Sequence, residues 1–397
     1  MPTVRDSNEP EVRRANAGLR GVEPEEVQHV LGSSSWSAES LLHNRDNGVT
    51  RGVWRVSVDR DEPRHRDGWP LPERAVVKIV SSAPSGNPAS WRPSEKPNHW
   101  CYWRREPEIY QSDVPLLGDE VGLTLPNLLD VFERENEGAA EISLWLEDVE
   151  GLPGEDFSLA QHEEAAEALG RFQALASRRE NGSHRPWASR GFLRDYSGFR
   201  VCPASTLDND ALWSTELVAE TLGEDVRRAA RLLLAERDSL LSVVEGLPTT
   251  LCHLDFWPKN LMRRESGESV VALDWAFAGY GAFGEDLGNY VPDCVMDHFV
   301  AADDLQALEE ATWRGYLRGL QECGWNGDEQ IVRLGVYASA VKYSWLLPTM
   351  LGQLERGESK KYGGGPADDL VLQLTERGKA IVHLAGWVEK ARKLAFP

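Results

Sequence analysis

The segment CHLDFWPKNLMRRESGESVVALDWAFAGYGAFGED, residues 252–286, combines polar residues at fixed spacing with apolar runs. It has the pattern His-x-Asp-x4-Asn at His253, Asp255 and Asn260, and a later apolar run ends in Asp274. Each residue alone has a simpler explanation, such as a turn aspartate, a buried histidine or a turn-forming asparagine. The joint spacing is much harder to produce by chance, so we take this segment as the candidate chemical centre.

The same segment predicts a β-hairpin. Strand-like residues around Leu261 and at 270–273 (VVAL) flank the loop 264–268, which contains a glycine and has the length of a hairpin connection. The hairpin would carry Asn260 at its start and Asp274 at the end of its second strand. We therefore expect these two side chains to lie close to each other and to Asp255.

These residue types suit phosphoryl transfer. That reaction needs Mg²⁺ to neutralise phosphate charge, hard oxygen ligands to hold the Mg²⁺, and a carboxylate beside the attacking hydroxyl. Asp255 is predicted to orient the hydroxyl and accept its proton, and Asn260 and Asp274 are predicted to ligate Mg²⁺. His253 is interpreted as a scaffold that hydrogen-bonds the backbone of the loop.

The chain before this segment changes from strand patterns to helix patterns. Strand-like runs occur at 53–58 (VWRVSV), 75–80 (AVVKIV) and 141–146 (EISLWL), and turn residues follow at 147–154. A capping-box spacing, Ser158 to Gln161, then precedes a helical apolar stripe. The change of period predicts a boundary between two lobes near residues 147–154.

Most of the second half has helical periodicity. One helix is expected to begin near Thr215 and to end at Gly246, and another is expected over residues 368–396. The predicted fold class is therefore α+β, with a strand-rich lobe over residues 1–147 and a mainly helical lobe over residues 148–397.

Composition restricts the class of partner. The chain has 397 residues and a formal net charge of -21, which disfavours nucleic acid and anionic membranes as partners because both are negatively charged. No run of about 18 apolar residues is present, and the five cysteines show no zinc spacing. We expect a reduced, cytoplasmic setting and no membrane partner; a cationic ligand would be favoured, and the oligomeric state is left open.

Residues 252–286 resemble the motif of the aminoglycoside phosphotransferase and choline kinase superfamily, which is similar to protein kinases in fold. The resemblance covers most of the chain and implies a bilobal, protein-kinase-like fold with ATP or GTP and Mg²⁺ as cofactors. It implies that Asp286 braces the catalytic loop. It also implies that the strand-rich lobe binds the nucleotide and that the helical lobe holds the acceptor.

The resemblance also implies nucleotide-binding residues in the first lobe. Lys78, within AVVKIV, fits the lysine that contacts the phosphates, and Glu106 fits the glutamate that pairs with it. Residues 47–52 (NGVTRG) resemble the loop that covers the phosphates, although they lack G-x-G-x-x-G. The candidate nucleotide-binding residues in this loop and in the hinge that would bond adenine are Gly48, Thr50, Trp145 and Leu146.

In this superfamily the acceptor often lies against acidic residues when it is an amine. Glu285, Asp293 and Asp297 are candidates for that role here, and for each one a solvated charge on a helix is the simpler explanation. The implied acceptor is a hydroxyl of a small molecule, such as an aminoglycoside or another antibiotic, a related amine, an amino sugar or a nucleoside. Antibiotic resistance and biosynthesis both remain open.

Two alternatives are kept. An inactive pseudokinase that binds a nucleotide or a protein is disfavoured because Lys78, Asp255, Asn260 and Asp274 are all retained. A protein kinase is disfavoured because only the short turn 275–284 lies between Asp274 and Glu285, where protein kinases have a long activation segment. Trp257 occupies the position where protein kinases carry a lysine, and whether Lys259 reaches the γ-phosphate stays open.

Overall fold

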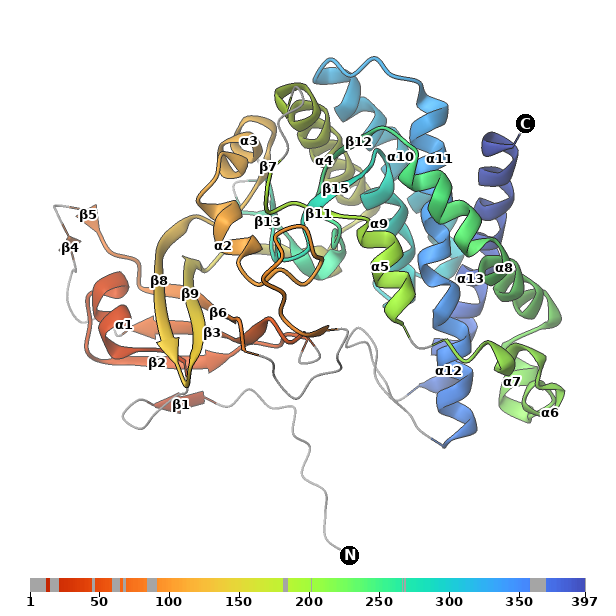
Figure 1. The fold of residues 1–397 in the computed structure, drawn as a ribbon, viewed down its shortest axis with the longest axis horizontal. Coiled ribbons are helices and arrows are strands. Elements are labelled where there is room, and N and C mark those ends of the chain that lie inside the picture. The colour runs from red at the N-terminus through yellow and green to blue at the C-terminus, as the bar shows by residue number, and fades with distance from the viewer. Residues whose placement is uncertain are drawn as a thin grey trace, which may run out of the picture. The chain divides into compact units, whose positions relative to one another are not determined.

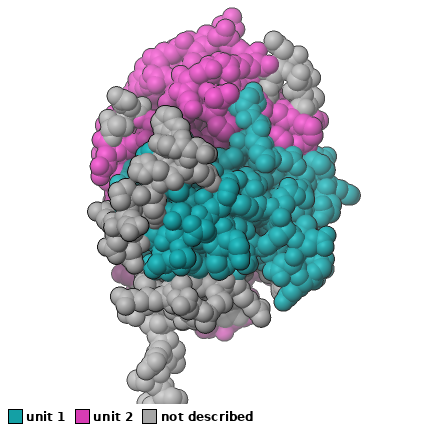
Figure 2. All heavy atoms as spheres, turned by 90° about the vertical axis from the view of Figure 1, so that its left-hand side faces the viewer, with its two compact units in different colours: residues 1–113, 126–150 teal, residues 114–125, 151–397 magenta. Residues whose placement is uncertain are grey.

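The chain forms two compact units, shown in teal and magenta in Figure 2: residues 1–113 with 126–150, and residues 114–125 with 151–397. The computed structural model describes residues 12–14, 21–44, 47–58, 65–66, 69–83, 91–180, 185–200, 202–265, 267, 269–357 and 369–396. Each unit is described separately below. The assignment of nucleotide binding to residues 1–147 and of catalysis to residues 148–397 stays a prediction.

Unit 1 is built on an antiparallel sheet of six strands (Figure 1). In sheet order the strands are β1 (Val12–Arg14), β2 (Trp36–Ser40), β3 (Thr50–Val58), β6 (Arg74–Ser81), β9 (Ala139–Glu147) and β8 (Leu128–Asn136). The predicted runs at 53–58, 75–80 and 141–146 form β3, β6 and β9, so the strand-rich character of this part of the chain is confirmed. Two short strands, β4 (His65–Arg66) and β5 (Trp69–Pro70), pair separately.

The core of unit 1 forms between the sheet and helix α1 (Pro24–Leu31). Alternate residues of β3 and β6 are buried there, together with Val27 and Leu31 of the helix. Trp145 belongs to this core, and its Nε1 donates a hydrogen bond of 2.8 Å to Glu26. An indole N–H needs such an acceptor when it is buried, and α1 supplies it.

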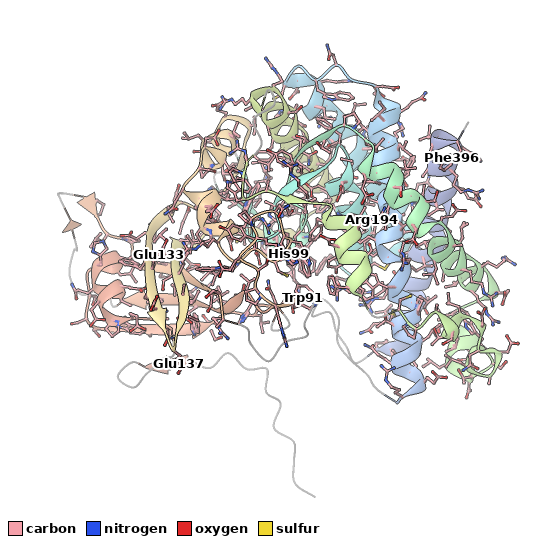
Figure 3. The ribbon with its side chains drawn as sticks, in the orientation of Figure 1. Trp91, His99, Glu133, Glu137, Arg194 and Phe396 are labelled. Carbon is pink, nitrogen blue, oxygen red and sulfur yellow. The ribbon has the colours of Figure 1, made fainter. Side chains whose placement is uncertain are left out.

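The β8–β9 hairpin turns through Glu137 and Gly138, at the tip labelled in Figure 3. Both residues have positive φ, 52° and 82°. This combination is typical of the two-residue turn whose twist matches that of the strands, and glycine adopts it without steric cost. The turn fixes the register of β8 against β9. Strand β9 then ends at Glu147, just before the boundary between the units at residue 150.

Unit 2 is mainly helical, as predicted. The helices are α3 (Val114–Val121), α4 (Leu159–Glu180), α5 (Phe192–Phe199), α6 (Asp210–Trp213), α7 (Glu216–Thr221), α8 (Glu224–Glu245), α9 (Glu285–Met296), α10 (Leu305–Glu322), α11 (Glu329–Ala338), α12 (Leu346–Glu355) and α13 (Leu370–Ala395). The 3-10 helix η6 (Ser339–Trp345) joins α11 to α12. In unit 1 the one helix besides α1 among the described residues is α2 (Arg105–Tyr110).

Two helix boundaries test the sequence patterns. The capping box is confirmed, because Gln161 Oε1 accepts hydrogen bonds of 2.8 Å from both N and Oγ of Ser158 at the start of α4. The single helix predicted from Thr215 to Gly246 is wrong. Leu222 and Gly223 have extended backbone angles and separate α7 from α8. Leu222 is buried there, so packing outweighs continuous helical periodicity.

Two small sheets position the predicted chemical centre in unit 2. One has the order β10 (Gly151–Pro153), β13 (Leu261–Arg264), β14 (Val270–Ala272) and β7 (Leu123–Thr124). The β13–β14 pair is the predicted hairpin, with Leu261 opposite Ala272. The other has β11 (Ser189–Arg190), β15 (Gly279–Ala282) and β12 (Thr249–Cys252). The loop that carries Asp255 therefore runs from β12 to β13.

Candidate functional site

Asp286 holds the loop after β12 in place. Its carboxylate accepts hydrogen bonds from the backbone N–H of His253 at 2.9 Å and of Leu254 at 2.7 Å. Leu254 has a φ of 65°, a left-handed conformation that is costly for a side chain with a Cβ. The buried carboxylate stabilises this turn. Asp286 therefore braces the loop, as the family resemblance implied.

His253 fixes the next part of the same loop. Its Nε2 lies 2.9 Å from the carbonyl oxygen of Leu273, and the N–H of Asp255 donates to its Nδ1 at 3.3 Å. This pair of contacts fits an imidazole protonated at Nε2. The histidine is buried and ties the loop to the end of the hairpin. The predicted scaffold role of His253 is confirmed.

Asp255, Asn260 and Asp274 are brought to one place. Asn260 Nδ2 donates 3.0 Å hydrogen bonds to both the backbone oxygen and Oδ2 of Asp255. The carbonyl oxygen of Asn260 accepts from the N–H of Leu273 at 2.7 Å, directly before Asp274. Asp274 itself has a φ of 55°, which turns the chain out of the hairpin at this point. The predicted juxtaposition of the three residues is therefore present, while their roles stay predictions.

The electrostatics of Asp255 show how closely the charges gather. Burial and, after it, the charge of Asp274 raise the pKa of Asp255 to about 7, against the opposing effect of the positive charge of Lys342. A second carboxylate beside Asp255 therefore disfavours ionisation until a cation compensates for it. This arrangement favours a positively charged group near Asp274.

The donor set at this point fits Mg²⁺. Asp274 offers a carboxylate, and Asn260 offers its amide oxygen because its amide nitrogen is bonded to Asp255. Within the described part of the chain, no three His, Cys, Asp or Glu side chains gather as a metal-binding group. Mg²⁺ bound to a nucleotide takes most of its ligands from phosphate and water. Two oxygens from the protein are therefore sufficient to hold it.

Lys342 was not identified from the sequence. It lies in η6, is buried, and its Nζ is 3.5 Å from Oδ2 of Asp293 on α9. The charges of Lys342 and Asp293 both affect the pKa of Asp255. The sequence does contain a clue to this residue, a single lysine within the mainly apolar run 335–348. A lysine in such a run indicates a buried ion pair, because a buried lysine is rare unless it is paired.

The three acidic candidates for the acceptor site have different surroundings. Asp293 is paired with Lys342, and Asp297, which caps the C-terminal end of α9, is 3.9 Å from Arg377. Glu285 accepts a hydrogen bond of 3.0 Å from the N–H of Ala282, and burial raises its pKa to about 8. Their role in acceptor binding stays a prediction.

Glu285 also lines a cavity of about 230 Å³. The cavity lies among Arg190, Phe192, Leu241 and Tyr280. Of the described residues that line it, none belongs to the Asp255, Asn260 and Asp274 group. The structure therefore places Asp293 and Asp297 near the C-terminal end of α9, whereas Glu285 begins this helix and lines a cavity that includes neither of them.

In unit 1, Lys78 and Glu106 form a buried ion pair. Lys78 Nζ lies 2.6 Å from Glu106 Oε2, and the two side chains are 7% and 2% exposed. Lys78 is on β6, and Glu106 is in the first turn of α2. The predicted pairing of these residues is thus present in the structure, and their contact with a nucleotide stays a prediction.

The other first-lobe candidates lie at strand ends. Gly48 precedes β3, and its N–H donates to the carbonyl oxygen of Trp91 at 3.0 Å, while Thr50 begins β3. Trp145 and Leu146 are near the end of β9, where the Trp145 side chain belongs to the core of unit 1. A hinge function would therefore use the backbone at these two positions.

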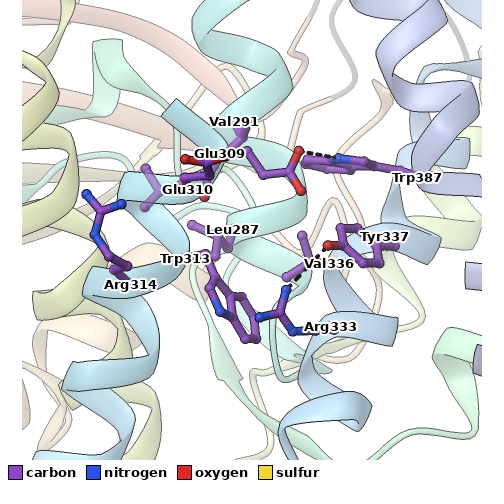
Figure 4. Close-up of a pocket in the computed structure, with 11 residues that line it drawn as sticks. Leu287, Val291, Glu309, Glu310, Trp313, Arg314, Arg333, Val336, Tyr337 and Trp387 are labelled. Carbon is purple, nitrogen blue, oxygen red and sulfur yellow. Dashed lines mark hydrogen bonds between the residues drawn. The ribbon is translucent and has the colours of Figure 1, made fainter. Parts of the chain in front are cut away.

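A second cavity in unit 2, of about 250 Å³, contains none of the predicted site residues (Figure 4). Its polar side chains contact one another. Glu309 accepts a hydrogen bond of 2.8 Å from Trp387, and the guanidinium of Arg333 is 4.0 Å from the ring centroid of Trp313. We assign no function to this cavity.

Among the described helices, none combines the length and apolarity needed to cross a membrane.

Unit 1 has an antiparallel sheet with a buried lysine–glutamate pair, and unit 2 is mainly helical with a braced His-x-Asp-x4-Asn loop. Together these features define the class of kinase-like phosphotransferases. The chain belongs to the phosphotransferase enzyme family, whose model matches residues 121–325. This confirms the superfamily indicated by the sequence. A comparison with curated protein sequences gives no significant match.

A solved structure with a TM-score of 0.50 supports the fold. An aminoglycoside phosphotransferase from Alicyclobacillus acidocaldarius is similar with a TM-score of 0.50 and 12% identity over 89% of this chain and 92% of that chain. An amicoumacin kinase has a TM-score of 0.47 and 11% identity, with 86% and 87% of the two chains covered. A choline kinase from Cryptosporidium parvum has a TM-score of 0.44 and 12% identity, with 94% and 95% covered. At these identities the likeness concerns the fold alone.

Proposed function

We propose that this protein transfers the γ-phosphoryl group of ATP or GTP to a hydroxyl of a small molecule. The observation that carries this proposal is the group of Asp255, Asn260 and Asp274, which hydrogen bonds hold at the junction of the catalytic loop and the β13–β14 hairpin. Membership of the phosphotransferase enzyme family supports the reaction class.

Each residue has a defined task in this proposal. Asp255 orients the acceptor hydroxyl and receives its proton, and Asn260 holds the Asp255 carboxylate in position through Nδ2. Asn260 Oδ1 and Asp274 would hold Mg²⁺, which when bound neutralises phosphate charge. Lys78, oriented by Glu106, would contact the nucleotide phosphates, as would the backbone at Gly48 and Thr50. The backbone at Trp145 and Leu146 would bond the base.

The short chain segment after Asp274 supports a small acceptor. Only β15 and its flanking turns lie between Asp274 and the start of α9 at Glu285. A protein substrate would need a longer docking segment there. Antibiotics of the aminoglycoside type, related amines, sugars and nucleosides are the acceptor classes to test, and a role in antibiotic resistance would follow from an antibiotic acceptor.

The test is a coupled assay of nucleoside diphosphate release by the purified protein. Mg²⁺-ATP and Mg²⁺-GTP are each offered with aminoglycosides, other antibiotics, nucleosides, amino sugars, neutral sugars and choline. Release that depends on an acceptor and is lost in Asp255→Ala is the expected result. Asp303→Ala is the matched control, because Asp303 is an exposed carboxylate paired with Lys379. Failure to bind either nucleotide would contradict the proposal.

The alternative is a pseudokinase that binds a nucleotide or a protein without catalysis. It would bind Mg²⁺-nucleotide and release no diphosphate with any acceptor, and Asp255→Ala would then leave all measured properties unchanged. The retained pairing of Lys78 with Glu106 and of Asp255 with Asn260 disfavours this alternative.

A further inference from the structure

Helix α9 carries a polar face that the proposed function does not yet use. Asn289 and Asp293 are four residues apart and lie on one side of the helix, and Asp297, the residue that caps its C-terminal end, follows at the same spacing. This helix packs on η6, and the Tyr343 hydroxyl of η6 lies 2.7 Å from Asp293 Oδ1 and 2.9 Å from the carbonyl oxygen of Asn289. The face is thus held against the element that carries Lys342.

The negative charge of this face is already compensated by the protein. Lys342 Nζ is 3.5 Å from Asp293 and Arg377 is 3.9 Å from Asp297, and both cationic side chains are buried. Amine recognition needs carboxylates whose charge is not yet neutralised, and a ligand ammonium beside a buried lysine would meet like-charge repulsion. The face is therefore poorly suited to a polyamine.

The same face retains capacity for neutral hydrogen bonds. The side-chain amide of Asn289, which is 1% exposed, makes no hydrogen bond with any described residue through either Oδ1 or Nδ2. Asp297 Oδ1 also lacks a hydrogen bond within the described structure, although it faces Arg377. A buried polar atom without a partner costs about 1–3 kcal/mol, which a hydrogen-bonding ligand would offset. Hydroxyl and amide groups can supply those bonds without adding charge.

We propose that the acceptor is an uncharged polyhydroxyl compound, of the sugar or nucleoside class, and that Lys342 excludes polycationic amines by neutralising Asp293. This inference rests on the proposed function and narrows its acceptor class. Lys342 acts here as a specificity residue that pairs with Asp293 and whose charge also influences Asp255. The acidic face of α9 would then serve a neutral ligand, in contrast to the cationic ligand that the net charge of the chain favours.

The first test compares matched acceptors. The ratio of kcat/KM for glucose to that for glucosamine, and for a ribonucleoside to that for its amino-sugar analogue, is measured with Mg²⁺-ATP. We expect the neutral member to be preferred by about tenfold, since one unfavourable charge contact of about 1.4 kcal/mol gives that ratio. Preference for the amino member in both pairs would overturn the proposal.

The second test measures spermine binding by calorimetry to protein saturated with Mg²⁺-ADP. Lys342→Met is compared with Lys379→Met, which removes the same charge from an exposed lysine paired with Asp303. Both variants have the same net charge, so non-specific attraction of spermine changes equally. We expect about tenfold tighter binding in Lys342→Met alone, because Asp293 becomes available. Equal affinities in the two variants would overturn the proposal.

Lys342→Met leaves Asp293 unpaired and can destabilise the fold, so the double variant Lys342→Met/Asp293→Asn is measured beside it. It removes both charges and should keep the wild-type affinity for spermine. If Asp293 were instead a ligand for amines, the double variant would lose spermine binding, which would contradict the proposal. The spermine experiment measures binding, so it can contradict this inference even when phosphoryl transfer is observed. Absence of phosphoryl transfer with every acceptor would instead count against the proposed function alone.

Discussion

Asp255 is held in place by its neighbours, as the proposed base role would require. Asn260 donates to its carboxylate, and His253 accepts from its backbone N–H. The first contact orients the side chain and the second fixes the backbone at this residue, both in the absence of a ligand. Such preorganisation is what a group that receives a proton in the transition state requires.

Replacing Asp255 with asparagine should separate binding from turnover. The variant keeps the size and polarity of the side chain, so nucleotide affinity should stay within about twofold. Turnover should fall by about 10²–10⁴, the usual contribution of a general base. Nucleotide affinity is measured by calorimetry and kcat by diphosphate release, with Asp303→Asn as the control. Turnover retained within a few-fold would exclude the base role.

At the same scale, two lysines near the centre have different surroundings. Lys259 lies 3.7 Å from Glu155 and 5.8 Å from the ring centroids of Trp257 and Phe299. Lys342 is buried beside Asp293, and its charge affects Asp255. Lys342, whose charge influences the predicted base, is far from it in the sequence.

At the scale of elements, the catalytic loop depends on the first turn of α9. Asp286 accepts from two consecutive N–H groups of the loop and, at 2.8 Å, from Gln173 of α4. Three elements thus meet at one buried carboxylate. Without it the left-handed turn at Leu254 would lose its main support.

Asp286→Ala should therefore lower both stability and turnover. It leaves two or three buried donors without a partner, which should cost about 3 kcal/mol or more of the free energy of unfolding. Turnover should fall because Asp255 is no longer held. Denaturant unfolding and kcat are measured together. Asp286→Asn, which keeps one acceptor oxygen, should lie between wild type and Asp286→Ala, and an unchanged unfolding midpoint in the alanine variant would contradict the bracing role.

The contact of α4 with α9 should make stability depend on pH. His162 of α4 is buried, its Nδ1 lies 2.6 Å from the hydroxyl of Tyr290, and burial lowers its pKa from 6.5 to about 4. The unfolded chain therefore binds this proton more readily than the native protein does. The stabilisation is present above pH 6.5 and is lost as the pH falls towards 4, by about 3 kcal/mol in total.

The measurement is the free energy of unfolding in urea at several pH values between 7 and 4. His162→Gln keeps a hydrogen-bonding group but does not titrate, so its stability should fall less steeply over this range. The same slope in wild type and variant would show that another group causes the pH dependence.

At the scale of the whole molecule, a Mg²⁺-nucleotide complex that binds only the native chain must stabilise it. At about one hundred times its Kd, the gain is about 2.7 kcal/mol. We expect Mg²⁺-ATP to raise the Tm of wild type more than ATP alone does. In Asp274→Ala the extra effect of Mg²⁺ should disappear while the Tm without ligand changes little. A full Mg²⁺ effect in that variant would remove Asp274 from the metal site.

The local patterns of the sequence were sufficient for much of the fold. The strand patterns of β3 and β6, the hairpin after Asn260 and the capping box at Ser158 each depend on neighbours within a few residues. Residue patterns and turn chemistry therefore reveal them. The group of Asp255, Asn260 and Asp274 was predictable for the same reason, because one loop and one hairpin deliver all three. The break between α7 and α8 was not, since it depends on packing of Leu222.

The environment of the site was decided by contacts between distant segments. In the sequence, Asp293 and Asp297 are two acidic residues four positions apart. In the folded chain, Lys342 of η6 and Arg377 of α13 approach them and neutralise that charge. Burial then changes the ionisation of the same groups. Spacing along the chain determines which residues a local element presents, whereas charge compensation and burial depend on which elements pack together, and only the tertiary structure decides that.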